Sequence, residues 1–231
     1  MKIAICYYGL AYNMDSINNS NAKNQPVNYL SCYESHKNNL WLPNNPDIFI
    51  HSWSTNVKDD ILKKYSPVSH IIEDQIDFYQ KASEIDNDYK KEFYYQRHHV
   101  LSRHYSEKKV IQLKAKLENE NNFKYDIVMI TRFDCIYNSI WSFENLNMNY
   151  FYVTGGWPCD YSKDLPDLWF FSNSDIMNIY GRIYDEFNEI FKISPLWSSH
   201  RAIKIQLDRY GLSNNIVHYK KHYIDSDIKR G

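Results

Sequence analysis

A short apolar segment that stops on two charged residues constrains the fold of this chain most. The segment is YDIVMITRFD, residues 125–134, and its apolar stretch ends just before Arg132 and Asp134. A strand buried on both faces of a parallel sheet is typically a continuous hydrophobic run of this kind. In open α/β sheets, ligands bind beyond the carboxyl ends of the strands, which is where Arg132 and Asp134 would lie. The segment therefore predicts a buried strand that leads into a binding site.

The spacing of Arg132 and Asp134 allows two interpretations. Alternate residues of an extended chain point the same way, so the cation and the carboxylate could face one ligand together. A carboxylate is a hard oxygen ligand, suited to a divalent metal that holds a diphosphate. The alternative is an ion pair between the two side chains that caps the strand end. A motif this short leaves both interpretations open.

Strand-like and helix-like segments alternate through the first two-thirds of the chain. The expected strands are residues 2–8, 47–53, 68–73 and 125–130, and the expected helices are residues 26–40, 56–65 and 93–120. Such alternation favours an α/β fold with a mostly parallel central sheet flanked by helices. Beyond Asp134 we expect strands at 150–153 and 168–172, helices at 175–191 and 199–210, and a strand in the basic tail. No repeat or linker interrupts the pattern, which predicts one domain.

Composition and charge disfavour several classes of function. With 231 residues, 43% of them hydrophobic, the chain is large enough to bury a sizeable core. Its 27 basic and 28 acidic residues give a formal net charge of -1, so nothing favours nucleic acid or an anionic membrane surface as a partner. No apolar run approaches the roughly 20 residues of a membrane span. We expect no nucleic-acid partner and no transmembrane segment, and we leave peripheral contact with a membrane open.

The start of the chain and its cysteines predict a compartment. The chain begins directly with strand-like sequence, without the apolar core and cleavage site of a signal peptide. Its cysteines are widely spaced and include no C-x-x-C pair: Cys6, Cys32, Cys135 and Cys159. We therefore expect a protein of the reducing cytoplasm.

Candidate binding residues end the first two expected strands. Tyr7, Tyr8 and Gly9 end the first, where a glycine lets a nucleotide approach the backbone and a tyrosine can stack on a base. A simple turn beside two core tyrosines would explain the same residues. Trp53 ends the second strand and offers a large flat surface for a pocket wall.

Two further groups could act on a phosphate or a hydroxyl. On the long expected helix, Arg103 and Ser106 are three residues apart and can share a face, so they could grip phosphates. In the loop after residue 155, Asp160, Asp164 and Asp167 are candidates for a general base that faces an acceptor hydroxyl. Asp167 is the strongest candidate because the apolar run LWFF follows it directly. Loops also favour aspartate for turn chemistry alone, which is the structural alternative.

Together these segments resemble a family of small glycosyltransferases with a GT-A fold, found in capsule, lipopolysaccharide and viral glycan clusters. The resemblance covers the chain up to about residue 174 and rests on KIAICYYG at 2–9, DIFIHSW at 47–53, Tyr105-Ser106, YDIVMITRFD at 125–134 and DLWFFS at 167–172. It implies a single GT-A-like, Rossmann-like domain. Residues 1–134 would form its nucleotide-binding half and residues 135–231 its acceptor-binding half.

By this resemblance, Arg132-Phe-Asp134 stands where GT-A enzymes carry an Asp-x-Asp motif. Asp134 would then bind Mg²⁺ or Mn²⁺ that bridges the diphosphate of a nucleotide sugar, with His218 in the tail as a second metal ligand. His200 and His222 compete for that second role. Arg132 replaces the first Asp of the motif, so it could contact the diphosphate directly, as a bidentate cation does well.

The implied activity is transfer of a sugar from a nucleoside-diphosphate sugar to an acceptor hydroxyl of a glycan. An inverting reaction is expected, with Asp167 preferred over Asp164 as the general base. Donor binding would fall to Tyr7, Tyr8, Gly9, Trp53, Arg103, Ser106, Arg132 and Asp134. The alternatives are another transferase that uses nucleotide sugars, or a non-catalytic module that binds a sugar nucleotide or a glycan. The arginine at position 132 keeps the second alternative open.

Overall fold

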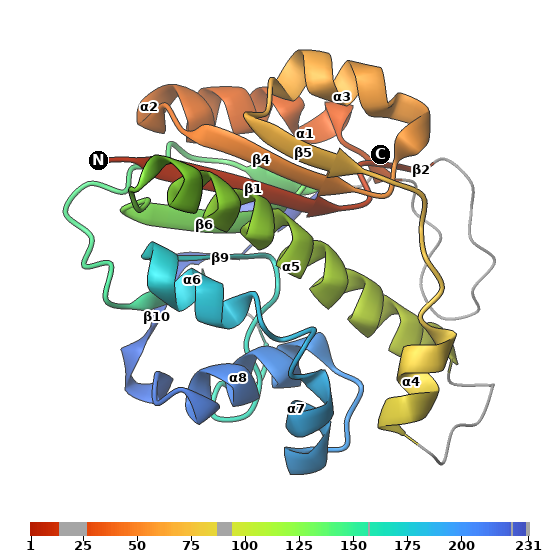
Figure 1. The fold of residues 1–231 in the computed structure, drawn as a ribbon. Coiled ribbons are helices and arrows are strands. Elements are labelled where there is room, and N and C mark those ends of the chain that lie inside the picture. The colour runs from red at the N-terminus through yellow and green to blue at the C-terminus, as the bar shows by residue number, and fades with distance from the viewer. Residues whose placement is uncertain (14–26, 87–93, 157, 223, 230–231) are drawn as a thin grey trace.

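A seven-stranded sheet forms the centre of the molecule, and helices cover both of its faces (Figure 1). The structure is a computed structural model that describes residues 1–13, 27–86, 94–156, 158–222 and 224–229. Along the sheet the strands follow the order β10-β8-β9-β6-β1-β4-β5. Their bounds are β1 Ile3–Gly9, β4 Asp47–Ser52, β5 Ser69–Ile72, β6 Ile127–Arg132, β8 Phe151–Gly155, β9 Trp169–Ser172 and β10 Ile216–Lys221.

The strands of this sheet run parallel except at β9. β1 is parallel to β4 and β6, β4 to β5, and β8 to β10, whereas β9 is antiparallel to both β6 and β8. The expected α/β class with a mostly parallel central sheet is confirmed. Because of its direction, β9 begins at the edge where β1, β4 and β6 end. This is the edge at which open sheets bind ligands.

Two layers of helices enclose the sheet (Figure 1). One face carries the continuous helical segment of α1 Leu30–Ser35, η1 His36–Trp41 and α2 Leu42–Asn44, together with α3 Lys58–Tyr65. The other face carries α4 Tyr79–Ile85, α5 Tyr94–Asn121, α6 Ser174–Tyr180, α7 Phe187–Ile193 and α8 Ser199–Arg209. Within the described ranges, no helix combines the length and the apolar character needed to cross a membrane.

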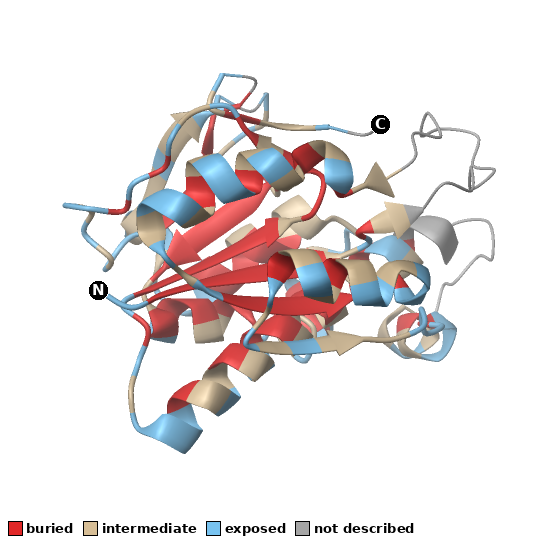
Figure 2. Ribbon diagram, turned by 90° about the horizontal axis from the view of Figure 1, so that it is seen from above, coloured by how far each residue is buried: buried red, intermediate tan, exposed pale blue. Residues whose placement is uncertain are grey.

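Side-chain alternation along the buried strands creates two apolar cores, one on each face of the sheet. In β1, Ala4, Cys6 and Tyr8 pack on the face that α5 covers, whereas Ile5 and Tyr7 pack on the face that α1 covers. Figure 2 shows the strands as buried and the helices as buried toward the sheet and exposed on their outer sides. Burial on both faces explains why these strands are continuous hydrophobic runs.

One expected helix is wrong, because residues 175–191 form two helices separated by turns. Gly181 stands at the break, where the chain packs closely against α5. An ideal Cβ at Gly181 would lie 2.8 Å from Ile111 Cγ2, so no larger residue fits there without a shift. The first helix is capped by Asn173, whose side chain accepts a hydrogen bond from the Ile176 N–H at 2.9 Å.

The other helix that differs from expectation is the first one. It was expected over residues 26–40, but it begins at Leu30 and continues to Asn44. Residue 26 itself lies outside the described residues. Pro43 does not stop the helix because it lies in the first turn of α2, a position that tolerates proline.

Several short elements carry no sequence pattern and were not expected. They are α4, β2 Tyr12–Asn13, β3 Val27–Asn28, η2 Thr55–Val57, β7 Cys135–Tyr137, η4 Ser213–Asn215 and β11 Ser226–Ile228. β11 pairs antiparallel with β7, and the Lys229 N–H donates to the Asp134 carbonyl oxygen at 2.8 Å. The tail therefore lies beside the end of YDIVMITRFD.

His36 is a fully buried polar group in the core on the α1 side. Its Nε2 donates to the Cys135 carbonyl oxygen at 2.6 Å, and its Nδ1 accepts from the Tyr65 hydroxyl at 3.1 Å, so the neutral ring is satisfied on both sides. Burial lowers the pKa of His36 from 6.5 to about 4, against smaller opposing effects of the Cys135 carbonyl and Asp134.

We expect His36 to make the protein less stable as the pH falls from 6.5 toward 4. Its folded-state pKa lies below its unfolded value, so the unfolded chain takes up the proton first and stability is lost across this window. A pKa difference of this size corresponds to about 3 kcal/mol. Urea unfolding at about pH 7.5 and about pH 4.5 measures the loss. His36→Gln should lose about 2 to 3 kcal/mol less than the parent over this range. The exposed His70 provides the control, and equal pH dependence of His36→Gln and His70→Gln would contradict the assignment.

Candidate functional site

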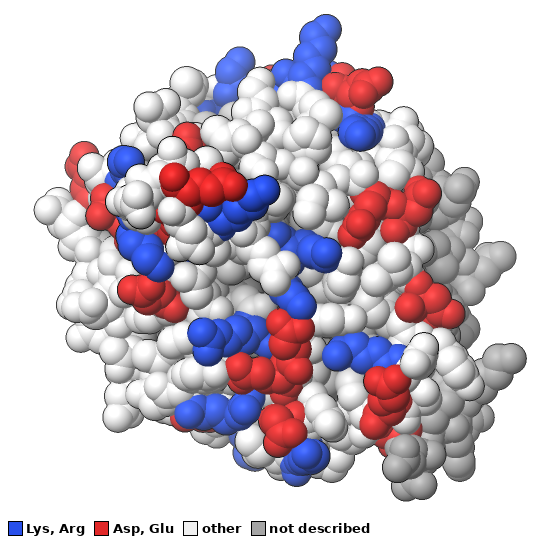
Figure 3. All heavy atoms as spheres, viewed as in Figure 1, with Lys and Arg blue, Asp and Glu red and all other residues white. Residues whose placement is uncertain are grey.

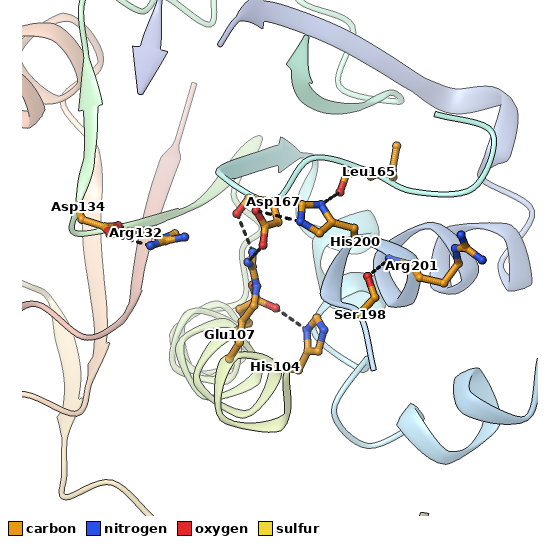
Figure 4. Close-up of polar contacts among 10 residues, drawn as sticks. His104, Glu107, Arg132, Asp134, Leu165, Asp167, Ser198, His200 and Arg201 are labelled. Atoms are coloured by element: carbon orange, nitrogen blue, oxygen red, sulfur yellow. Dashed lines mark hydrogen bonds and ion pairs between the residues drawn. The ribbon is translucent and has the colours of Figure 1, made fainter. Parts of the chain in front are cut away.

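Three neighbouring strands, β1, β6 and β9, bring several of the expected site residues together at one corner of the sheet. We use the word corner for the site formed by Tyr8, Arg103, Arg132 and Asp167. Tyr8 of β1 lies opposite Arg132 of β6 in the parallel register. The end of β6 also pairs with the start of β9, so Asp167, just before β9, lies at the same edge. α5 packs on the face of the sheet to which Tyr8 points and adds Arg103. Figure 4 shows Arg132 and Asp167 pointing toward each other.

Arg103 and Asp167 form a largely buried ion pair in this corner, with side chains 12% and 17% exposed. Arg103 Nη1 donates to Asp167 Oδ2, and Nη2 donates to the Asp167 carbonyl oxygen at 2.8 Å. Arg103 Nε donates to Glu107 Oε1 at 2.8 Å, one turn further along α5. Burial alone would raise the pKa of Asp167, but Arg103, then His200 and Arg132, hold it below its ordinary value. The Asp167 carboxylate is therefore ionised at neutral pH.

Arg132 and Asp134 form a second, bidentate pair. Arg132 Nε donates to Asp134 Oδ1 at 2.8 Å, and Nη2 donates to Oδ2 at 2.6 Å. The Asp134 side chain is 2% exposed, whereas that of Arg132 is 21% exposed. Of the two interpretations of the sequence, the structure contains the ion pair. Arg132 rather than Asp134 keeps an exposed face toward the corner (Figure 4).

Tyr8 contributes a buried hydroxyl that has no hydrogen-bond partner among the described residues. Its side chain is 4% exposed, and the Arg103 guanidinium carbon lies 5.3 Å from the centre of its ring. Burial raises the pKa of Tyr8 well above its ordinary value, and Arg103 only partly opposes this effect, so the hydroxyl stays protonated. Leaving a buried hydroxyl without a hydrogen-bond partner costs about 1–3 kcal/mol. An unpaired group of this kind is expected where a bound ligand supplies the missing partner.

The start of α8 adds a histidine and a second arginine–carboxylate pair. Arg201 donates to both oxygens of Asp164, at 2.9 and 3.1 Å. His200 Nδ1 lies 2.7 Å from the Leu165 carbonyl oxygen, and His200 Nε2 lies 3.7 Å from Asp167 Oδ1. Of the two candidate bases, Asp167 therefore faces the corner (Figure 4). The carboxylate of Asp164 is instead paired with Arg201.

Gly9 and Ser106 meet in a chain of hydrogen bonds that joins β1, α5 and β4. The Gly9 N–H donates to Ser106 Oγ at 2.9 Å, and Ser106 Oγ lies 2.6 Å from His51 Nδ1. The Glu73 carboxylate can only accept, so the neutral His51 ring donates from Nε2 to Glu73 Oε1 at 3.1 Å, and its Nδ1 accepts the proton of Ser106. Ser106 is fully buried by these partners. Gly9 itself has φ +90° and open space where a Cβ would be, so a ligand can still approach its backbone.

Tyr7 and Trp53 lie in the apolar cores and do not join the corner. Tyr7 points to the face opposite Tyr8, where its hydroxyl accepts a hydrogen bond from Trp41 Nε1 at 2.9 Å. Trp53 is 7% exposed and stacks on Tyr105, with ring centroids 5.5 Å apart. Strand alternation separates Tyr7 from Tyr8, and packing against α5 covers Trp53.

The divalent metal implied by the resemblance does not fit the residues that the structure describes. Both carboxylate oxygens of Asp134 are bonded to Arg132, which is itself a cation. His218 lies on β10, three strands from β6, on the order of 14 Å away at the usual strand spacing. His222, its alternative, lies 3.8 Å from Asp227 in the tail. Within the described ranges, no three His, Cys, Asp or Glu side chains gather as metal ligands.

Glu107 and His104 belong to the corner and were missed in the sequence. The second oxygen of Glu107, Oε2, lies 2.8 Å from His104 Nδ1. Burial would raise the pKa of Glu107, but Arg103 and then His104 hold it below its ordinary value. Glu107 could have been found from its position four residues after Arg103, because residues at this spacing on a helix can form an ion pair.

Outside the corner, charged side chains form mixed pairs at the surface. Figure 3 shows basic and acidic side chains interspersed on the face of the molecule that carries α5. Pairs such as Lys108–Asp185 and Arg209–Glu186, at 2.6 and 2.8 Å, contribute to this mixture. Exposed pairs of this kind are usually worth about 0–1 kcal/mol. The pairs of Arg103 with Asp167 and Arg132 with Asp134 are less exposed, with side chains between 2% and 21% exposed.

The corner combines groups that suit a phosphorylated ligand and a proton transfer. A partly exposed guanidinium can bind phosphate in bidentate geometry, and an ionised carboxylate can accept a proton. No protein-family model matches this chain, and no curated protein matches it. The function is therefore inferred from these groups and from the fold that positions them.

The Gly9–Ser106–His51 contacts predict that Ser106 stabilises the fold. Ser106→Ala leaves the Gly9 N–H and His51 Nδ1 without partners, which costs about 1–3 kcal/mol. In a chain of this size, each 1 kcal/mol lowers the melting temperature by about 2–4 °C. Ser102→Ala on the same helix is the matched control, since Ser102 makes one bond, to Gln75 at 3.2 Å. Equal melting temperatures of Ser106→Ala and the parent would contradict the prediction.

Proposed function

We propose that this chain is a GT-A-like glycosyltransferase, which moves a sugar from a nucleoside-diphosphate sugar to an acceptor hydroxyl of a glycan. The observation that carries the proposal is the meeting of Arg103, Arg132 and Asp167 at the carboxyl edge of parallel strands. Sugar transfer requires positive groups for the diphosphate that leaves and a base for the hydroxyl that attacks. Both kinds of group lie side by side in this corner.

The arrangement of the sheet supports a GT-A-like domain with two functional halves. Residues 1–134 contribute β1, β4, β5 and β6, the parallel strands that a nucleotide-binding half requires. Residues 135–231 contribute β8, β9 and β10 and would bind the acceptor. β9 is inserted next to β6, so Asp167 lies where the two halves adjoin. A base in this place can reach a hydroxyl that approaches a donor sugar.

Asp167 is the general base in this proposal, in preference to Asp164. Its Oδ2 is bound by Arg103, whereas its Oδ1 lies 3.7 Å from His200 Nε2, beyond hydrogen-bond distance. Oδ1 is therefore the oxygen that can take the proton of an acceptor hydroxyl. Asp164, by contrast, has both oxygens bonded to Arg201. Attack by the activated hydroxyl opposite the leaving diphosphate inverts the configuration of the sugar.

A non-catalytic module that binds a sugar nucleotide or a glycan is the second candidate. The observation that favours it is the ion pair of Arg103 and Asp167, which holds the pKa of Asp167 below its ordinary value. A carboxylate with a low pKa is a weaker base, whereas binding requires the arginines alone. Another transferase that uses nucleotide sugars would share the same phosphate-binding groups.

We place the proposed enzyme in the cytoplasm, with peripheral membrane contact left open. Cys6, Cys32, Cys135 and Cys159 are all free, and the first three are buried. Free thiols are the normal state in a reducing compartment. The partners in this proposal are the nucleotide-sugar donor and the glycan acceptor.

A screen of UDP-, GDP-, ADP- and dTDP-sugars tests the proposal. We expect one of them to raise the melting temperature and to be hydrolysed slowly, with release of the nucleoside diphosphate. With that donor and a glycan acceptor, Asp167→Asn should lower kcat by about 10²–10⁴-fold at saturating donor, while the variant still binds the donor. The kcat of Asp164→Asn in the same assay tests the second candidate base. Asp185→Asn, at an exposed pair on the surface, is the control.

The outcomes separate the candidate functions. Binding without turnover by any donor and acceptor supports the non-catalytic module. Full activity of Asp167→Asn would refute the assignment of the base. A protein that binds none of the nucleotide sugars would refute the glycosyltransferase and the module that binds a sugar nucleotide, and one that binds no glycan either would refute the glycan-binding module as well.

A further inference from the structure

We propose that Arg132 and the Tyr8 hydroxyl bind the donor diphosphate in place of a divalent cation, and that Asp134 positions Arg132. This inference rests on the proposed function, because it names the groups that hold the diphosphate of the same donor. Three observations carry it: the engagement of Asp134, the donors that Arg132 has left, and the unpaired hydroxyl of Tyr8.

Asp134 acts on Arg132 and not on a metal. Its two oxygens each accept a hydrogen bond from Arg132, and its side chain is almost fully buried. The tail closes over its backbone, with the Lys229 N–H donating to the Asp134 carbonyl oxygen at 2.8 Å. A divalent ion on the same carboxylate would be adjacent to a guanidinium of like charge. Bidentate pairing instead fixes the plane in which that guanidinium points.

Arg132 retains donors for a ligand after it has bound Asp134. A guanidinium has five N–H donors. Two of those on Arg132 are used by Asp134, on Nε and Nη2, which leaves three without a partner in the described part of the chain. Burial alone would lower the pKa of Arg132, but Asp134 and then Tyr8 raise it, so the charge is permanent. The side chain remains 21% exposed, which leaves a path to these donors.

The Tyr8 hydroxyl is the second donor. β1 and β6 place Tyr8 directly opposite Arg132, and Arg103 lies against the Tyr8 ring. The hydroxyl is buried without a partner among the described residues, although a charged and polar environment surrounds it. Residues opposite each other in the register point to the same face of the sheet, so in this proposal an oxygen of the diphosphate on Arg132 completes the hydrogen bond of this hydroxyl.

In this proposal, hydrogen-bond donors that point in fixed directions, rather than an excess of positive charge, determine the binding of the diphosphate. Arg103 and Arg132 are paired with Glu107, Asp134 and Asp167, so the corner has no excess of positive charge before a ligand arrives. A diphosphate would gain hydrogen bonds from the donors that Arg132 and Tyr8 leave without a partner among the described residues. Charge-assisted hydrogen bonds from a guanidinium to phosphate are among the strong ones in proteins.

The first experiment measures binding by isothermal titration with UDP, GDP, ADP, dTDP and inorganic pyrophosphate, in excess EDTA and then with Mg²⁺ or Mn²⁺. We expect at least one nucleoside diphosphate to bind in EDTA, with a Kd within about threefold of that measured with metal. Binding that appears only with a divalent ion would overturn this inference and leave the proposed function intact. Absence of binding in both conditions would overturn both.

Variants at position 132 identify the cation. Arg132→Gln should weaken diphosphate binding in EDTA by about tenfold or more, and Arg132→Lys should weaken it less because a point charge remains. Arg209→Gln removes the same charge at the pair with Glu186 and should leave the Kd unchanged. Circular dichroism and melting temperature establish that each variant is folded. Equal Kd values for Arg132→Gln and Arg209→Gln would overturn the assignment.

Tyr8→Phe and Asp134→Asn separate binding from stability. Tyr8→Phe removes a hydroxyl that is unpaired without ligand, so the melting temperature should not fall, while diphosphate binding should weaken several-fold. Asp134→Asn should weaken binding in EDTA, because Arg132 loses its bidentate partner. A metal ligand would give the opposite pattern, with binding in EDTA unchanged and only the response to Mn²⁺ lost. Unchanged binding in EDTA for both variants would overturn the proposal.

Discussion

The buried pair of Arg103 and Asp167 holds the candidate site together. It connects α5, which lies across the sheet, to the loop that enters β9. Removing two charges from water costs several kcal/mol per ion, so such a pair persists only when further hydrogen bonds compensate. Glu107 and the Asp167 carbonyl oxygen provide them. The pair therefore fixes the distance between α5 and β9, and with it the surroundings of Tyr8 and Arg132.

The central strands could be predicted from the sequence because burial on both faces leaves no room for polar alternation. β1, β4 and β6 each contain a continuous apolar run, and each was expected at nearly its observed position. The position of Arg132 and Asp134 followed from the same run, since parallel strands end at one edge of a sheet. The ion pair between them was one of two interpretations that the spacing allowed.

The orientation and partners of the site residues could not be predicted, because they depend on strand order and direction. Tyr7 and Tyr8 are equivalent in sequence, and only the placement of α5 decides that Tyr8 faces the corner. A strand as short as β9 carries no signal for its direction, yet its antiparallel insertion places Asp167 beside β6. The same insertion puts β9 and β8 between β6 and His218, which removes His218 from the corner. Gly181 likewise interrupts a helical sequence pattern because it packs closely against Ile111 of α5, a contact that the local sequence does not indicate.

A metal on two carboxylates and the Arg132–Asp134 pair are different answers to the same electrostatic requirement. Two carboxylates on one side of an extended chain need a divalent ion before a diphosphate can approach. In the proposed diphosphate site the cation is Arg132, which is part of β6, so its presence would depend neither on metal supply nor on pH in the physiological range. A guanidinium, however, offsets one negative charge where Mg²⁺ offsets two. The remaining interaction must then come from directed N–H and O–H donors, and this requirement gives the unpaired Tyr8 hydroxyl and the bidentate Arg132–Asp134 pair a single explanation.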